Sequence, residues 1–428
     1  MVGLEIRSTR SQSATRAEES LDELSVLAQT AGAQVVERFL QFRDSAEAAT
    51  LLGSGKVQEL RQAVNLHEAD VVIFDVELTP TQLRNLEREL GTRVVDRTQL
   101  ILDIFASRAR TREGQLQVEL AQLNYLMPRL AGRGTAMSRL GGGIGTRGPG
   151  ETQLETDRRK IARRIKRIQQ DIETVRTGRT IQRRQRQGVP LATVAMAGYT
   201  NAGKSTLFNR LTGADVVADA RLFATLDPTV RHVILPSRRK VLMSDTVGFI
   251  QSLPTTLVKA FRATLEEVVE AKLILHVVDA SSAAGPQHTA QVMKVLAEIG
   301  AAVTPQILVL NKADLYSESP DAHAMAARLL AETEEKAPPR AVCVSARTGQ
   351  GIPELLRMID DLLPLDPVSP CRFRLPVGEG GPLSLLHDTT QVQSVTYLDE
   401  VCEVECIAPE SIRRRLARYL VTAKPSAE

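Results

Sequence analysis

A nine-residue run, GYTNAGKST at residues 198–206, constrains the fold more than any other part of the chain because it fits the phosphate-loop pattern G-x4-G-K-[ST]. An apolar run at residues 191–197 precedes it and a helical pattern at residues 206–212 follows, as the motif requires. In that setting, loop N–H groups hold phosphate oxygens, Lys204 reaches the β- and γ-phosphates, and the Ser205 hydroxyl binds Mg²⁺. The run therefore predicts a doubly wound α/β sheet. A similar stretch, GSGKV at residues 53–57, lacks the spacing and is expected to be a turn before a helix.

Three further motifs follow in the order that a GTP-hydrolysing domain needs. DTVG at residues 245–248 ends an apolar strand, so that Asp245 can hold Mg²⁺ through water and the Gly248 amide can sense the γ-phosphate. NKAD at residues 311–314 places a carboxylate, Asp314, where it can accept hydrogen bonds from guanine N1–H and the exocyclic amine, a pair that adenine lacks. SAR at residues 345–347 suits backbone contact with the guanine oxygen. The four motifs predict the following nucleotide-binding residues: Gly198, Tyr199, Thr200, Asn201, Ala202, Gly203, Lys204, Ser205, Thr206, Asp245, Thr246, Val247, Gly248, Asn311, Lys312, Asp314, Ser345, Ala346 and Arg347.

The first hundred residues predict a small α/β domain. Apolar runs at residues 33–37, 69–75 and 92–96 are expected to be strands, and the patterns at 57–66 and 80–90 to be helices. Residues 1–20 have no hydrophobic signal core and are expected to form a disordered tail. A second nucleotide site in this domain stays open, although no loop there has phosphate-binding spacing.

Two helices with narrow apolar seams are predicted next. Apolar residues step by three and four over residues 115–130 and again over 154–175, which favours an antiparallel hairpin, with two helices of a larger bundle as the alternative. The connecting segment, residues 132–150, holds eight glycines and three arginines. It is either a flexible linker or a tip that inserts into a partner surface.

The second of these helices carries most of the positive charge. Residues 158–188 contain twelve Lys/Arg and two acids, net +10, which leaves −7 for the rest of a chain whose total is +3. A solvated helix face is the simpler interpretation, but self-repulsion favours a polyanion, and nucleic-acid phosphates fit better than an anionic membrane because the seam has no aromatics.

Composition excludes several classes of protein. The chain has 428 residues, 43% of them hydrophobic and 25% charged, so disorder throughout and a disulfide-stapled miniprotein are excluded. Its four cysteines include no C-x2-C pair, which predicts free thiols and no zinc site. No apolar run is long enough to span a membrane. A cytoplasmic location is therefore expected. A monomer is expected rather than an oligomer, although no sequence feature decides between them.

The motifs taken together resemble the HflX family of translational GTPases over nearly the whole chain. The resemblance is carried by GGGIGTRGPGETQLE at 141–155, the phosphate loop, LFATLDPT at 222–229, DTVGFI at 245–250 and LVKAFRATLEE at 257–267. It implies that Thr225 is the switch I threonine that completes the Mg²⁺ shell, so Lys204, Thr225 and Gly248 become the expected catalytic residues and Ser205 and Thr225 the metal ligands. It adds Phe223, Ala224, Thr225, Leu226 and Asp227 to the expected nucleotide site.

The resemblance also implies a partner and a role. The protein is expected to bind GTP and GDP, to bind the large (50S) ribosomal subunit and its rRNA, to place the glycine-rich tip near the peptidyl-transferase centre, and to split stalled or idle ribosomes. Two alternatives remain: an RNA-binding or remodelling factor that nucleotide merely stabilises, and a GTPase that partners a tRNA-modifying enzyme.

Two site residues depart from the Ras pattern. Phe249 follows Gly248 where Ras-like enzymes have the glutamine that orients the attacking water, which predicts slow intrinsic hydrolysis until a partner orders the segment. Asn201 matches a position where related GTPases coordinate K⁺, so K⁺ joins Mg²⁺ as a candidate cofactor.

The expected fold class is thus α/β, with an N-terminal α/β domain, a long antiparallel helical hairpin, a P-loop GTPase doubly wound sheet and a small C-terminal α+β domain. The expected boundaries are 1–20 for the tail, 21–107, 108–188, 189–365 and 366–428.

Overall fold

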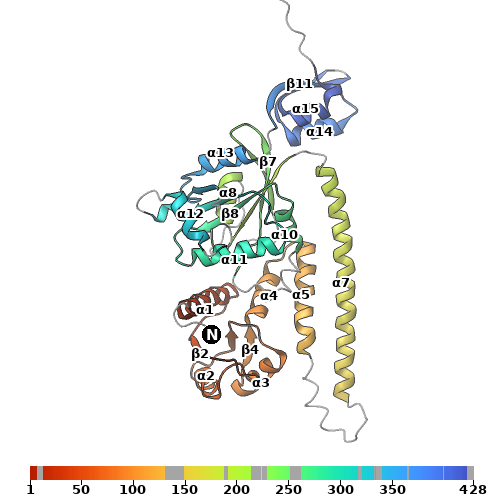
Figure 1. The fold of residues 1–428 in the computed structure, drawn as a ribbon. Coiled ribbons are helices and arrows are strands. Elements are labelled where there is room, and N and C mark those ends of the chain that lie inside the picture. The colour runs from red at the N-terminus through yellow and green to blue at the C-terminus, as the bar shows by residue number, and fades with distance from the viewer. Residues whose placement is uncertain are drawn as a thin grey trace, which may run out of the picture. The chain divides into compact units, whose positions relative to one another are not determined.

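Figure 1 shows the chain in a computed structural model. The structure describes residues 1–6, 13–130, 149–187, 191–213, 223, 229–250, 262–316, 321–331, 333, 340–363, 366–398 and 400–421. The chain divides into two compact units. The first contains residues 1–175, 219–227 and 250–263, and the second contains the remainder.

The first unit contains a parallel sheet with the strand order β2-β1-β3-β4. Its strands are β1 (Val2–Ile6), β2 (Phe39–Arg43), β3 (Val71–Phe74) and β4 (Arg93–Asp96), and its helices are α1 (Ser13–Thr30), α2 (Ser54–Leu66), α3 (Pro80–Leu90) and α4 (Arg97–Arg108). α3 begins with a capping box between Thr79 and Gln82 and ends at Gly91, which has a φ of 69°. The predicted α/β domain and both of its predicted helices are confirmed.

Two sequence predictions for this sheet are wrong. Residues 2–6 do not belong to a disordered tail but form β1, an inner strand that pairs with β2 and β3. Residues 33–37 are not a strand, because β1 pairs instead with Phe39–Arg43. Hydrogen bonding to the start of β1 begins at the end of the predicted run. The Met1 amino group donates to Glu37 O at 2.7 Å, and the Met1 carbonyl accepts from Phe39 N at 2.8 Å.

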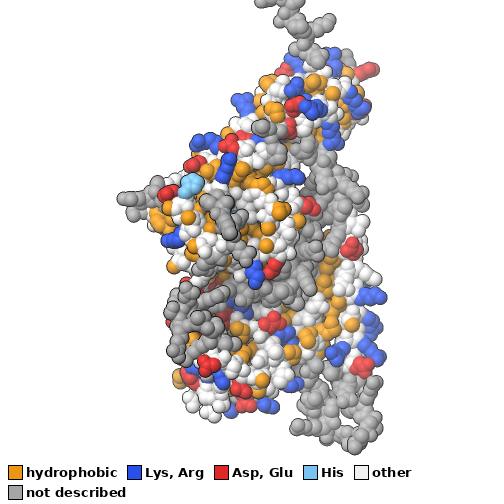
Figure 2. All heavy atoms as spheres, in the orientation of Figure 1, with side chains coloured by type: hydrophobic (Ala, Val, Ile, Leu, Met, Phe, Trp, Pro, Cys, Tyr) orange, Lys and Arg blue, Asp and Glu red, His pale blue; other side chains and the backbone are white. Residues whose placement is uncertain are grey.

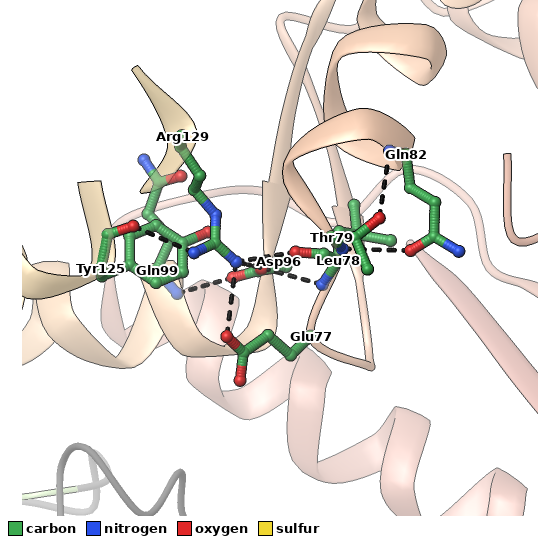
Figure 3. Close-up of polar contacts among 8 residues, drawn as sticks. All are labelled: Glu77, Leu78, Thr79, Gln82, Asp96, Gln99, Tyr125 and Arg129. Carbon is green, nitrogen blue, oxygen red and sulfur yellow. Dashed lines mark hydrogen bonds and ion pairs between the residues drawn. The ribbon is translucent and has the colours of Figure 1, made fainter. Parts of the chain in front are cut away.

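A buried polar network fixes the next helix, α5 (Arg112–Arg129), to this sheet (Figure 3). Asp96 is fully buried and accepts from Leu78 N at 3.0 Å; as the N-cap of α4 it also accepts from Gln99 N at 2.9 Å. Arg129 Nη2 donates to Leu78 O at 2.7 Å and to Asp96 Oδ2 at 3.3 Å, while its guanidinium lies 3.5 Å from the centre of the Tyr125 ring. The buried carboxylate is therefore paired, which is the condition for burying a charge.

The predicted helical hairpin is formed by α5 and α7 (Pro149–Gln187). Leu116 packs with Ile168 and Ile172 in one apolar seam, which Leu120, Leu123 and Val175 border. Beside the seam, Arg164 makes a two-pronged contact with Glu119, at 2.7 and 2.8 Å. Residues 131–148, most of the predicted glycine-rich tip, lie outside the described residues.

The second unit contains a six-stranded sheet with the order β10-β9-β8-β5-β7-β6, in which only β6 runs antiparallel to its neighbour. The strands are β5 (Thr193–Gly198), β6 (Thr229–Ile234), β7 (Lys240–Asp245), β8 (Leu273–Asp279), β9 (Gln306–Asn311) and β10 (Arg340–Cys343). The helices are α8 (Lys204–Thr212), α10 (Arg262–Val269), α11 (Gly285–Glu298), the short 3₁₀ turn η1 (Ala313–Leu315), α12 (Ala322–Leu330) and α13 (Ile352–Leu362). Near-continuous apolar strands such as β8 are typical of a sheet that is covered on both faces.

The same unit ends in an antiparallel sheet with the order β11-β13-β12, which confirms the expected α+β domain. Its elements are β11 (Val368–Pro376), α14 (Gly380–Thr389), β12 (Gln391–Leu398), β13 (Val401–Pro409), α15 (Glu410–Arg415) and the 3₁₀ turn η2 (Ala417–Tyr419). Lys240 Nζ on β7 donates to His387 O on α14 at 3.1 Å, which joins the two sheets of this unit. Among the described helices, none is long and apolar enough to cross a membrane.

Candidate nucleotide-binding site

The phosphate loop runs from the end of β5 to the start of α8 and needs glycine at both of its ends. Gly198 has a φ of 156°, and a Cβ there would lie 2.2 Å from Val277 O on the neighbouring strand. Gly203 has a φ of 89°, and a Cβ there would lie 2.2 Å from Asn311 Nδ2. Each contact is shorter than any Cβ tolerates, so the two glycines let the loop lie against β8 and β9.

Lys204, the first residue of α8, is buried beneath this loop. Its Nζ donates to Gly198 O at 3.0 Å and to Tyr199 O at 2.7 Å, so the ammonium group holds the loop's backbone in place. Burial lowers the pKa of Lys204 to about 8, and the nearby Asp245 carboxylate opposes that shift. A phosphate would supply the negative charge that offsets the cost of burying this cation.

Two of the three residues with predicted roles at the metal ion, Ser205 and Asp245, are in contact. Ser205 Oγ donates to Asp245 Oδ2 at 2.8 Å, although 40 residues separate them in sequence. The Asp245 side chain lies at the end of β7 and is fully buried. A hydroxyl and a carboxylate oxygen are hard donors that Mg²⁺ prefers, and Mg²⁺ takes few protein ligands besides water and phosphate. This donor set fits Mg²⁺.

The segment after β7 lies directly against the phosphate loop. A Cβ at Gly248 would approach Thr200 Cγ2 to 2.8 Å and Lys204 Nζ to 2.9 Å, so only glycine fits there. The next residue, Phe249, donates its N–H to Gly198 O at 3.1 Å and accepts from Thr200 N at 2.7 Å. Two backbone hydrogen bonds therefore join this segment to the loop, and one of them uses a loop N–H of the kind that binds phosphate.

At the opposite end of the loop, Asn311 links three parts of the site. Its Nδ2 donates to Ala202 O at 2.8 Å, and its Oδ1 accepts from Ala346 N at 3.0 Å. The side chain is buried at the end of β9. Asn311 thus fixes the phosphate loop relative to the SAR segment after β10, and with it the spacing between phosphate and base positions.

The remaining predicted base-binding residues are held by further side-chain contacts. Asp314 Oδ1 accepts from Ser345 Oγ at 2.6 Å, and Lys312, with a φ of 64°, pairs through Nζ with Asp279 Oδ2 at 2.6 Å. Arg210 on α8 donates to the backbone oxygens of Ala346, at 3.2 Å, and of Arg347. The structure therefore brings the four sequence motifs together at one edge of the sheet.

Two histidines near the loop are neutral. The Tyr199 and His288 rings stack with their centroids 3.7 Å apart and an interplanar angle of 9°. Burial lowers the pKa of His288 to about 4, against the attraction of Asp279, and burial lowers the pKa of His276 to about 4 with the Lys204 charge acting in the same direction. The loop therefore has neutral aromatic neighbours at physiological pH.

Of the predicted residues 223–227, only Phe223 lies among the described residues; Ala224, Thr225, Leu226 and Asp227 lie outside them. Phe223 is buried, has a φ of 59°, and packs edge-on against the Phe105 ring of α4 at a centroid distance of 4.6 Å, all within the first unit. The Phe223 side chain therefore packs against an aromatic ring of the first unit.

Three residues of the site were not predicted from the sequence. Asp279 pairs with Lys312, Arg210 donates to the backbone of the SAR segment, and His288 stacks on Tyr199. None belongs to a motif, and each contact spans more than 30 residues of sequence. The position of Asp279 directly after an apolar strand was the one available signal, because carboxyl ends of parallel strands gather at the same edge of the sheet.

A strand–loop–helix with a buried lysine and a Ser–Asp pair defines a P-loop GTPase domain when Asn311 and Asp314 lie at the same edge of the sheet, as they do here. Family models agree: "GTP-binding GTPase N-terminal" matches residues 18–106, "GTP-binding GTPase Middle Region" 108–186 and "50S ribosome-binding GTPase" 193–312.

Similar proteins place the chain more narrowly. GTPase HflX of Caldanaerobacter subterraneus subsp. tengcongensis is 45% identical over 95% of this chain and 91% of its own. GTPase HflX of Alkalihalophilus pseudofirmus is 58% identical over 69% of this chain and 70% of its own. The chain belongs to the GTPase HflX family. A GTP-binding protein of Sulfolobus solfataricus, solved in complex with GDP, aligns over 84% of this chain and 97% of its own at 23% identity and a TM-score of 0.44, too distant to add to the argument.

Proposed function

We propose that this GTPase binds the large ribosomal subunit in its GTP form and splits stalled or idle ribosomes in the cytoplasm. The observation that carries the proposal is the exposed basic face of α7, in the same chain as the nucleotide site. The description of the matching G-domain family, 50S ribosome-binding, supports the same partner.

The described part of α7 presents its cations to solvent (Figure 2). The exposed basic side chains are Arg158, Arg159, Lys160, Arg163, Arg164, Lys166 and Arg167. On the apolar side of the same stretch Ile165 and Ile168 are buried, and Ile168 packs against Leu116 of α5. One helix face is therefore committed to the hairpin and the other is available to RNA phosphates, whose neutralisation releases counterions.

In the proposed site, each motif has a separate task. Lys204 and the loop N–H groups of residues 198–206 would hold the phosphates, and Ser205 and Thr225 would ligate Mg²⁺, with Asp245 holding it through water. Asn311, Lys312 and Asp314, with residues 345–347, hold guanine. Mg²⁺, when bound, neutralises charge that develops on the phosphates. Apart from the N-terminal tail, whose residues 2–6 form β1, the domain boundaries expected from sequence, 21–107, 108–188, 189–365 and 366–428, are part of the same proposal.

Phe249 explains how the ribosome would control hydrolysis. Its side chain is buried, and a phenyl ring cannot orient water. Its backbone hydrogen bonds hold the segment after β7 on the phosphate loop. A phosphate that takes the Thr200 amide breaks the hydrogen bond of that amide to Phe249 O, so binding of GTP would move this segment and the surface it presents to a partner. Hydrolysis is therefore slow in the isolated protein and faster on large subunits.

Sedimentation through a gradient with ribosomes tests the proposal. Protein loaded with a non-hydrolysable GTP analogue should co-sediment with 50S particles and convert 70S ribosomes into subunits, whereas Lys204→Ala should do neither. Splitting that proceeds equally without nucleotide would support a passive RNA-remodelling factor. Binding to tRNA, or to a partner protein instead of subunits, would support a role in tRNA modification.

We also propose K⁺ as a second cofactor at Asn201. This residue is exposed on the loop and has a left-handed backbone, with a φ of 59°, which non-glycine residues rarely adopt. A cation there would act as a positive charge beside the phosphates. Hydrolysis should be faster in KCl than in NaCl, and Asn201→Ala should remove the difference. Equal rates of the unaltered protein in both salts would contradict this cofactor.

A further inference from the structure

Two cysteines face each other across the C-terminal sheet. Cys371 on β11 and Cys406 on β13 are direct register partners in an antiparallel pair. Their sulfur atoms lie 3.8 Å apart, and Cys371 Sγ also lies 3.5 Å from Cys406 O. Register partners in antiparallel strands have Cα atoms about 4.5–5.5 Å apart, which falls within the range that a disulfide spans. A disulfide requires the sulfur atoms to move from 3.8 Å to about 2 Å apart.

The two thiols differ in exposure. Cys406 is buried, with 1% of its surface exposed, beside Val404 and Ala408 in the apolar core of this domain. Cys371 is half-buried at the edge of that core, so a small molecule in solvent can reach it. One thiol is thus accessible and the other is shielded directly behind it.

The surroundings also make the accessible thiol the more acidic of the two. The contact with Cys406 lowers the pKa of Cys371, and the Arg413 guanidinium of α15 acts in the same direction. The same contact and burial raise the pKa of Cys406. Arg413 donates through Nη1 to Ser369 Oγ at 2.7 Å, and its buried Nε has no hydrogen-bond partner within the described part of the chain. A cation beside an accessible thiol is the setting of a reactive cysteine.

We propose that Cys371 and Cys406 form a reversible dithiol–disulfide site that a peroxide oxidises, with Cys371 as the attacking thiol and Cys406 as the resolving thiol. The site is independent of the nucleotide pocket, since it lies in the sheet β11-β13-β12. Transient disulfides of this kind are the ones found in reducing compartments.

The reaction balances with hydrogen peroxide as the oxidant. The Cys371 thiolate attacks one peroxide oxygen, an S–O bond forms, the O–O bond breaks, and the departing hydroxide takes up a proton to become water. The Cys406 sulfur then attacks the Cys371 sulfenic acid, an S–S bond forms, and the Cys406 proton leaves with the hydroxyl group as a second water. Two thiols are oxidised by two electrons and one peroxide is reduced. Two molecules of a small thiol reverse the step by exchange: the first forms a mixed disulfide with one cysteine, and the second releases that cysteine and leaves as part of the small-molecule disulfide.

The other two cysteines provide internal controls. Cys402 is also buried on β13, but its register partner on β11 is Leu375. Cys343 lies on β10, in the other sheet of the unit. Proximity of sulfur atoms thus predicts one cross-link among the four cysteines.

The experiment treats the full-length protein with equimolar hydrogen peroxide, blocks remaining thiols by alkylation, and maps the peptides by mass spectrometry. We expect one cross-linked peptide pair containing Cys371 and Cys406, and its loss after treatment with dithiothreitol. Cys402→Ala should leave the cross-link unchanged. In Cys406→Ser, Cys371 should instead oxidise to sulfenic and then sulfinic acid.

Arg413→Gln should slow cross-linking severalfold while guanine nucleotide binding, measured on the same sample as a check of folding, stays unchanged. The proposal is overturned if unaltered protein gives sulfinic acid at Cys371 with Cys406 still alkylated. It is also overturned if the cross-link joins another pair, or if Cys371 and Cys406 resist peroxide that oxidises Cys343.

Discussion

At the scale of single residues, substitutions of two glycines beside α8 distinguish backbone strain from a steric clash of the added Cβ. Gly203 and Gly213 both have left-handed backbones, with φ values of 89° and 66°. A Cβ at Gly203 would lie 2.2 Å from Asn311 Nδ2, whereas a Cβ at Gly213 would meet nothing within 4 Å. Alanine therefore strains the backbone at both positions, by about 1–2 kcal/mol, but displaces Asn311 only at Gly203.

We expect Gly203→Ala to weaken GDP binding by at least about tenfold, equivalent to roughly 1.4 kcal/mol, because Asn311 must release Ala202 O or Ala346 N. Gly213→Ala, the matched control, should lower the melting temperature and leave the GDP dissociation constant unchanged. Calorimetric titration and thermal unfolding give the two quantities. Equal loss of GDP affinity in both variants would show that strain, and not the position of Asn311, decides binding.

At the scale of elements, local pattern predicted those whose sequence signals are strong and missed those that a distant partner decides. α3 occupies the predicted residues because Pro80, the Thr79 cap and Gly91 mark both of its ends. β1 was missed because five residues at the chain start carry no turn signals, and its place in the sheet depends on pairing with residues 39–43. Asn311 was predicted at the nucleotide site, but its contacts with Ala202 and Ala346 were not, and Asp279 was missed altogether, since these contacts are long-range.

The Arg129–Asp96 contact holds α5, and therefore the hairpin, on the N-terminal sheet. Asp96 is fully buried and Arg129 is 10% exposed, so Arg129→Met leaves an uncompensated buried carboxylate. We expect it to lower the free energy of unfolding by about 3–5 kcal/mol. Urea unfolding measures the loss. Asp96→Asn added to Arg129→Met should recover part of it, because the amide keeps the cap of α4 without a charge.

Arg164→Met is the control for this hairpin contact. The partner of Arg164, Glu119, is also on α5, but the two side chains are 46% and 37% exposed, and ion pairs that solvent reaches contribute little. The unfolding midpoint should hardly change. If Arg164→Met destabilises the chain as much as Arg129→Met, then the surface pair and not the buried network holds the hairpin.

At the scale of the whole molecule, the net charge of +3 is the sum of +10 on residues 158–188, called the arm, and −7 on the rest of the chain. If the arm binds ribosomal RNA, the affinity should fall steeply as the salt concentration rises. If the chain binds through its near-neutral surface as a whole, the affinity should depend little on salt. Neutralising Arg163, Arg164, Lys166 and Arg167, all exposed on α7, should reduce the slope of log affinity against log salt by roughly three units. Arg164 should contribute least of the four because Glu119 already holds its guanidinium.

The matched control neutralises four exposed arginines of the N-terminal domain, Arg61, Arg84, Arg88 and Arg93, and so removes the same net charge. Affinity for 50S particles, measured from low to physiological salt, should then keep its slope, because these side chains do not lie on the arm. A slope that falls equally in both variants would mean that total charge governs the encounter, and a flat salt profile of the unaltered protein would remove the arm from RNA binding altogether. A loss confined to the α7 variant is the result that a phosphate-binding helix face requires.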